Sequence, residues 1–120
     1  MINLRVLTIL LMLGSPALGC GGDDDEEEEL PDVDCDTGAV PDYEDVAAFD
    51  TCTNCHDSSK TGAARAGAEE GVNFDTEAAA QKSAMKAAHE VYEGEMPPKG
   101  AGTLTDAQKE QLYRWALCSD

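Results

Sequence analysis

The sequence predicts an all-α fold in which about three main helices form one small domain. From Cys35 onward, apolar residues recur at helical spacing, and little of the chain alternates between apolar and polar residues as strands do. Helix start and stop signals divide this region into three helical segments, separated by loops rich in glycine or proline. The chain has 120 residues, which is enough for one small domain behind a short leader.

The first helix is expected from about Pro41 to Cys52. Proline is favoured at the first position of a helix, and three acids that follow it suit the positive end of the helix dipole. Tyr43, Val46 and Ala47 would share one face of this helix, which therefore has an apolar side to bury.

A second helix is expected after a loop over residues 54–74, in which three glycines stand among small residues. It should run from about Asp75 to Tyr92 or Glu93, because this segment is rich in alanine and Gly94 can end it. Its predicted apolar stripe consists of Met85, Ala88, Val91 and Tyr92.

The third helix has the clearest start. Thr105, with Gln108 three residues later, has the pattern of a capping box, in which each side chain bonds the other residue's backbone. Leu112 and Trp115 then share a face toward the expected core, and the helix should end near Cys118.

Residues 1–19 resemble a bacterial lipoprotein signal. A positively charged start precedes an apolar run over residues 6–13, which is too short to span a bilayer as a helix. The following Ala-Leu-Gly-Cys at 17–20 predicts lipidation of Cys20, and an ordinary secretory signal that leaves this cysteine free is the alternative. The expected location is the periplasm or the cell surface, with a lipid anchor in a bacterial membrane. The glycine after the cysteine favours the outer membrane.

Residues 20–34 are expected to form a disordered acidic tether ahead of a domain at 35–120. Seven consecutive acids occupy positions 23–29, and such a block repels itself and buries nothing. A weak cation or partner site is the alternative interpretation of this run.

Residues 52–56 have the pattern C-x-x-C-H, which is typical of covalent haem attachment. The thiols of Cys52 and Cys55 can add to the two vinyl groups of one haem, and His56 is then held under the iron as an axial ligand. The pattern also occurs in dithiol redox sites and in zinc sites, here with His89 as a fourth ligand. Dithiol chemistry of the thioredoxin kind needs a βαβ context that this chain lacks, and the adjacent histidine is awkward for a tetrahedral zinc site.

The other cysteines can be assigned by elimination. With Cys20 given to lipid, and Cys52 and Cys55 to haem, Cys35 and Cys118 remain at the two ends of the domain. In an oxidising compartment two such thiols are expected to pair, and the alternative is that both stay free. A disulfide that closes so long a loop would stabilise the fold by about 4 kcal/mol.

A second axial ligand for the iron is expected from Met96. It lies in a loop and is followed by two prolines that restrict the backbone. A thioether is a soft ligand that raises the reduction potential of the iron. A methionine that fills a gap in the core, ligation by His89, and an open or water-bound position are the alternatives.

Over residues 35–118 the sequence resembles a class I cytochrome c domain, in particular the small domains found on bacterial lipoproteins. The matching parts are the helix that leads into the C-x-x-C-H motif, the Met-Pro-Pro loop at 96–98, and the final helix. The resemblance implies that His56 is the proximal ligand, Met96 the distal ligand, and the two motif cysteines the thioether anchors. In that family the first and last helices cross and pack, which would bring the terminal cysteines close.

The resemblance implies a monohaem c-type cytochrome that carries single electrons between redox partners outside the cytoplasm, and not an enzyme. A haem-based sensor or binder of small ligands, with an open or labile distal site, is the alternative. Mitochondrial members present a lysine-rich docking face, whereas this domain has 16 acidic and seven basic residues from Cys35 onward. Such a surface repels nucleic acid and favours a redox partner with a basic docking patch.

Overall fold

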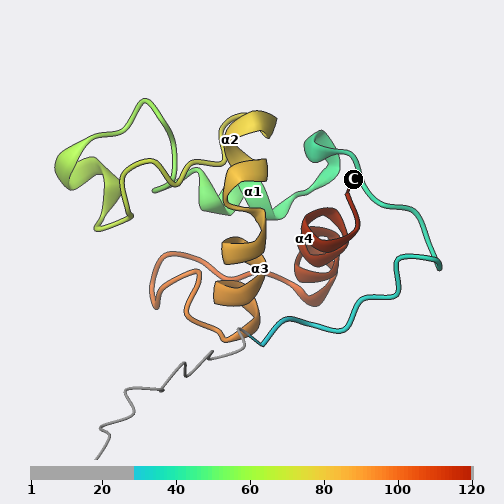
Figure 1. Ribbon diagram of the computed structural model, residues 1–120. Helices are drawn as coiled ribbons and strands as arrows, with labels where there is room; N and C mark the ends of the chain where they lie inside the picture. The colour runs from blue at the N-terminus through green and yellow to red at the C-terminus, as the bar shows by residue number, and fades with distance from the viewer. Residues whose placement is uncertain (1–28, 120) are drawn as a thin grey trace, which may run out of the picture.

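The computed structural model describes residues 29–119, and this part of the chain is helical and contains no β-strand (Figure 1). The all-α prediction is therefore confirmed for the described residues. No helix among them is both long and apolar enough to cross a membrane. The signal, Cys20 and most of the acidic run lie outside this range. The elements in chain order are η1 (Tyr43–Asp45), α1 (Ala48–Cys52), η2 (Gly62–Arg65), α2 (Glu77–Lys82), α3 (Ala84–Tyr92) and α4 (Asp106–Cys118).

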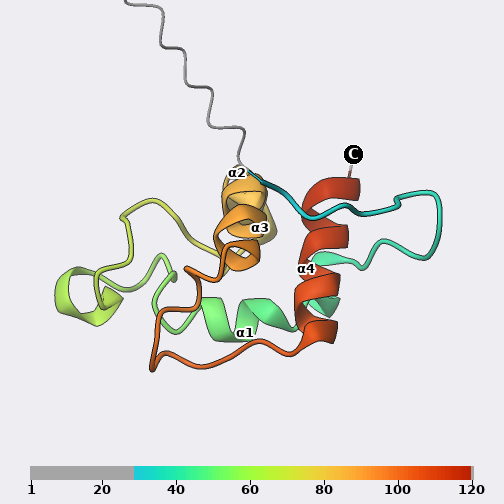
Figure 2. The same ribbon diagram turned by 90° about the horizontal axis from the view of Figure 1, so that it is seen from below.

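Helix α4 is the longest element, and it packs against both α3 and α1 (Figure 2). Its start is the predicted capping box. The Thr105 hydroxyl accepts a hydrogen bond from the Gln108 backbone N–H, and the Gln108 side-chain oxygen accepts one from the Thr105 backbone N–H. Leu112 and Trp115 are buried on the inner face, as the periodicity predicted.

The first predicted helix is broken into two pieces. A 3-10 turn ends at Val46, whose ψ of 85° is not helical, and α1 follows with only five residues. Val46, Ala48 and Phe49 are all buried. On one continuous helix, the first two of these would point about 200° apart. The break therefore lets the chain bury both of them, at the cost of helical continuity.

The second predicted helix is also divided, because Ser83 adopts φ −117° and ψ 13° between α2 and α3. Ala87, Ala88 and Val91 are buried, whereas Met85 and Tyr92 are 49% and 48% exposed. The prediction that Met85 and Tyr92 belong to the buried stripe was wrong. Instead, the α3 residues one position earlier in the sequence than these two pack inside.

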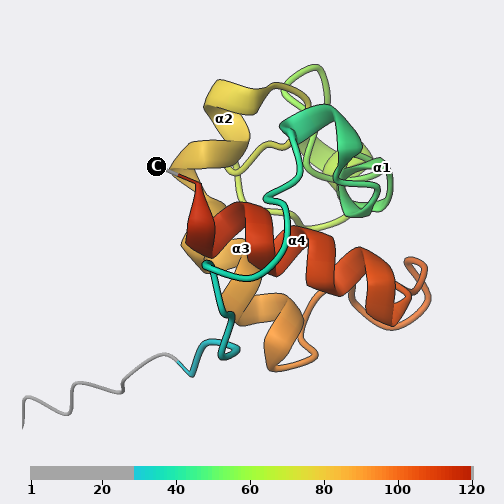
Figure 3. The same ribbon diagram turned by 90° about the vertical axis from the view of Figure 1, so that its right-hand side faces the viewer.

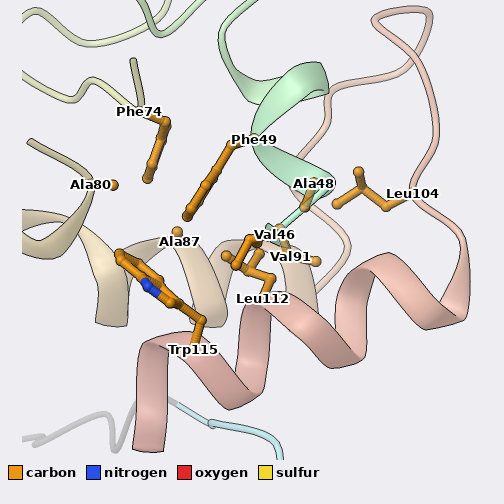
Figure 4. Packing of buried hydrophobic residues seen from close by; sticks show 10 residues of the cluster. All are labelled: Val46, Ala48, Phe49, Phe74, Ala80, Ala87, Val91, Leu104, Leu112 and Trp115. Carbon is orange, nitrogen blue, oxygen red and sulfur yellow. The ribbon is translucent and has the colours of Figure 1, made fainter. Parts of the chain in front are cut away.

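The core is built around an aromatic group contributed by three parts of the chain (Figure 4). Phe49 of α1 stacks on Phe74, with ring centroids 5.5 Å apart, and meets Trp115 of α4 edge-on at 5.1 Å. Smaller side chains fill the remaining space. The buried cluster comprises Val46, Ala48, Phe49, Phe74, Ala80, Ala87, Val91, Leu104, Leu112 and Trp115.

The two ends of the domain are joined. The Sγ atoms of Cys35 and Cys118 lie 1.99 Å apart, at disulfide bonding distance, which is the predicted pairing. Beside them, the Arg114 guanidinium donates hydrogen bonds to the carbonyl oxygens of Asp34 and Thr37. These contacts hold the N-terminal segment across α4 (Figure 3). Residues 31–34, which the sequence placed in the tether, line a shallow groove with α4.

Candidate functional site

A cavity of about 450 Å³ lies between the end of α1, the loop after η2, helix α3 and the loop that precedes α4. This volume falls within the range of cofactor and small-molecule sites. Its lining includes all four residues that the sequence analysis assigned to haem: Cys52, Cys55, His56 and Met96. The remaining wall is contributed mainly by apolar side chains, among them Val72, Phe74, Ala87, Val91, Pro97, Pro98 and Leu104.

The C-x-x-C-H motif forms a tight turn at the end of α1. The backbone N–H groups of Cys55 and His56 both donate to the carbonyl oxygen of Cys52, at 3.2 and 2.8 Å. The hydroxyl of Thr53 donates to the Phe49 carbonyl and so caps the helix end. This turn keeps both thiols, which are half-buried and unpaired, on the wall of one cavity.

The thiol of Cys52 is protonated at neutral pH. Burial raises its pKa to about 11, because the thiolate would lose its hydration. Thiols that exchange with disulfides have the opposite property, a lowered pKa that makes the thiolate available. The environment of Cys52 therefore gives no support to the dithiol redox alternative.

His56 is held from two sides. Its Nδ1 lies 3.0 Å from the carbonyl oxygen of Val72, and its ring meets the Phe74 ring edge-on with centroids 5.5 Å apart. A carbonyl oxygen can only accept, so Nδ1 carries the proton and Nε2 keeps the lone pair that can bind a metal. The Phe74 N–H also donates to the His56 carbonyl at 2.9 Å, which fixes the backbone.

Met96 is placed by the end of α3. After Gly94, which has a φ of +79° and turns the chain, the backbone N–H groups of Glu95 and Met96 both donate to the carbonyl oxygen of Glu90, at 2.9 and 3.0 Å. The peptide bond that follows, Met96–Pro97, is cis. The half-buried methionine side chain thus reaches the cavity from a loop anchored on α3.

No family model, curated protein or solved structure matches the chain.

The side chains at the cavity fit a covalently attached haem. Two thiols stand at the sequence spacing that thioether attachment requires, and an oriented imidazole and a thioether are available as one nitrogen and one sulfur ligand. The apolar walls suit the faces of a porphyrin. Near the opening, Glu69 of the loop and Lys86 of α3 form an ion pair between two sides of the cavity.

His89, the rival ligand, is not among the residues that line the cavity. Its Nδ1 lies 3.2 Å from the backbone carbonyl oxygen of Glu29. Within residues 29–119, the side chains of His, Cys, Asp and Glu do not come together in threes that could hold a metal ion. The described structure thus does not assemble the zinc site considered from the sequence.

One residue at the site was not predicted from the sequence. Arg65 lines the cavity, and it is only 4% exposed although it carries a charge. Its burial depends on carbonyl groups of the surrounding loop. Every residue has a backbone carbonyl, so the amino-acid sequence does not show which of them will accept hydrogen bonds. A single arginine in a glycine-rich loop also has no motif that identifies it.

Proposed function

We propose that this protein is a monohaem c-type cytochrome that carries single electrons between redox partners outside the cytoplasm. The observation that supports this most directly is the convergence of Cys52, Cys55, His56 and Met96 on one apolar-walled cavity. The first three lie within one motif of five residues, but Met96 comes from a separate loop forty residues after His56. Its arrival at the same cavity is independent of the motif.

The residues of the site have distinct roles in this proposal. Cys52 and Cys55 anchor the haem, which supplies one-electron ferric–ferrous chemistry when bound. His56 presents Nε2 because the Val72 carbonyl fixes its tautomer and ring orientation. Met96 offers a soft, uncharged sulfur that favours the ferrous state. The apolar wall excludes water, which also favours the less charged form of the cofactor.

The partner and the location belong to the same proposal. The chain is exported and anchored to a bacterial membrane by a lipid on Cys20, and the acidic segment holds the domain away from the surface. The domain from Cys35 onward has a formal charge of −9, from 16 acidic and seven basic residues. We propose redox partners with a basic docking patch, because opposite charge speeds encounter.

A pyridine haemochrome assay tests the proposal. The full chain is expressed with its signal in a bacterium that matures c-type cytochromes, and the purified protein is extracted with acidified organic solvent. We expect one haem per chain that survives extraction, and a reversible one-electron titration.

Two double variants serve as the test and the control for covalent attachment. Cys52→Ser with Cys55→Ser removes both thioether anchors and should abolish covalent haem, whereas the matched pair Cys35→Ser with Cys118→Ser should retain it. Wild-type protein that matures without haem, while a control cytochrome in the same cells acquires its own, would reject the proposed function.

A further inference from the structure

Arg65 is a buried cation on the wall of the cavity, and within residues 29–119 no carboxylate forms an ion pair with it, although its charge helps to lower the pKa of Asp75. Among residues 29–119, the ion pairs are Lys86 with Glu69 and Arg114 with Glu110, and neither involves Arg65. A buried charge is costly unless its polar atoms are satisfied. The acceptors that bind the guanidinium N–H groups therefore indicate the role of Arg65.

All five guanidinium N–H groups of Arg65 can be matched to acceptors in the surrounding loop, and none of these acceptors is a carboxylate. No N–H group is left over for a further ligand such as a haem propionate. The matched acceptors are the carbonyl oxygens of Ala68 (3.2 Å, from Nε), Asp57 (2.9 Å, from Nη1), Glu69 (2.7 Å, from Nη2) and Val72 (3.0 Å, from Nη2), and the side-chain oxygen of Asn73 (3.0 Å, from Nη1).

One of these acceptors is shared with the proximal histidine. The Val72 carbonyl oxygen lies 3.0 Å from Nη2 of Arg65 and 3.0 Å from Nδ1 of His56. A carbonyl oxygen has two lone pairs and can accept from both donors. The cation and the imidazole therefore compete for the electron density of one oxygen atom.

We propose that Arg65 is a positioning residue that raises the reduction potential of the haem through the Val72 carbonyl, an inference that rests on the proposed function. The charged donor draws electron density from the carbonyl oxygen, so the oxygen accepts less strongly from His56 Nδ1–H. A weaker hydrogen bond leaves the imidazole less basic and less able to stabilise ferric iron. The fixed positive charge acts in the same direction, because it disfavours the more positive oxidised state.

The decisive measurement is the midpoint potential of Arg65→Met, which removes both the charge and the N–H groups. We expect the ratio of reduced to oxidised protein at a fixed solution potential to fall about tenfold, equivalent to about 59 mV for a one-electron couple. Lys82→Met is the matched control, since it removes one positive charge from an exposed position on α2 that does not line the cavity. Its potential should change far less.

Arg65→Lys separates the two contributions. It keeps the charge but cannot reproduce the five-donor fork, so its potential should lie between those of the wild type and Arg65→Met. In the reduced, diamagnetic protein, the His56 Nδ1–H resonance should move downfield in both variants as its hydrogen bond to Val72 strengthens. A residue that only holds the loop together would alter stability and leave this resonance in place.

The outcomes distinguish the two proposals. Haem content is measured on every variant, and absence of covalent haem from the wild type would reject the function itself. If haem is bound, and Arg65→Met has the wild-type potential and the wild-type His56 resonance, the role of Arg65 is overturned while the function stands. Should Arg65→Met fail to fold, the same two readouts on Arg65→Lys decide, and wild-type values for both overturn the inference.

Discussion

The hydroxyl of Tyr43 donates a hydrogen bond to the carbonyl oxygen of Phe74 at 2.7 Å, across 31 residues of sequence. Phe74 in turn stacks on Phe49 and meets the His56 ring edge-on. Burial raises the pKa of Tyr43, so its hydroxyl remains a donor throughout the neutral range. This bond connects the turn before α1 to the residue that packs against His56.

Replacement of Tyr43 by Phe should lower the free energy of unfolding by about 1–2 kcal/mol, because the Phe74 carbonyl loses its partner. Urea unfolding followed by circular dichroism measures the change. Tyr92→Phe is the control, since Tyr92 is 48% exposed and its ring contact with Tyr113 is kept. Equal stability of the two variants would show that the Tyr43 hydrogen bond contributes nothing.

The Cys35–Cys118 bond should contribute strongly to stability, because it spans a sequence separation of 83. In the chain-entropy model, a loop of this length corresponds to about 4.5 kcal/mol. The double variant Cys35→Ala with Cys118→Ala should therefore unfold at much lower urea concentration, and as a form of the proposed cytochrome it should keep its covalent haem. Wild-type protein treated with a thiol reductant should behave like the variant, and unchanged unfolding in both cases would contradict the prediction.

In the proposed cytochrome, Met96→Ala should convert a low-spin, six-coordinate haem into a high-spin haem that binds carbon monoxide when reduced, and should lower the reduction potential. Met85→Ala offers a matched control, because Met85 is 49% exposed and does not line the cavity. Absorption spectra of both oxidation states provide the measurement. A low-spin spectrum that survives in Met96→Ala would refute the ligand assignment, and ready binding of carbon monoxide by the wild type would favour the sensor alternative.

The raised pKa of Cys52 predicts how the haem-free protein reacts with iodoacetamide. In a Cys55→Ser background, alkylation of Cys52 should be slow at pH 8 and should rise with pH toward a midpoint of about 11. In urea the midpoint should fall to the ordinary thiol value near 8.5. A midpoint near 8.5 in the folded protein would show that the thiol is not desolvated.

The same shift has a consequence for stability. The folded protein disfavours the thiolate, so the contribution of Cys52 is fully present below the unfolded pKa of about 8.5 and is lost as the pH rises to about 11. Haem-free Cys55→Ser protein should therefore lose stability across this range of pH. Additional replacement of Cys52 by Ala should remove that part of the loss.

Features with strong local signals were predictable. The capping box at Thr105 determines the start of α4 through neighbouring side chains alone, and the structure begins the helix there. The C-x-x-C-H spacing placed three site residues together because they lie on one turn. Met96 reaches the same cavity, although its role as a ligand stays a prediction.

Features decided by packing were not predictable. Nothing in the local sequence breaks the helix at Ser83, where serine has only a modest preference against helix. Within α3, Val91 is buried and Met85 is exposed, and that choice depends on what the helix meets in the core. Arg65 was missed for a related reason, since its acceptors are mostly backbone carbonyls brought together by the course of the loop.

The shared Val72 carbonyl also bears on the order in which the domain folds. His56 and Val72 are 16 residues apart, and the acceptors matched to Arg65 lie within eight residues of it. Contacts between near neighbours close short loops, which costs little entropy and occurs quickly. The Met96 N–H also bonds a near neighbour, the Glu90 carbonyl, whereas Met96 itself lies forty residues after His56. We therefore expect the segment around His56 and the segment around Met96 each to form early by itself, and the two segments to meet later in folding.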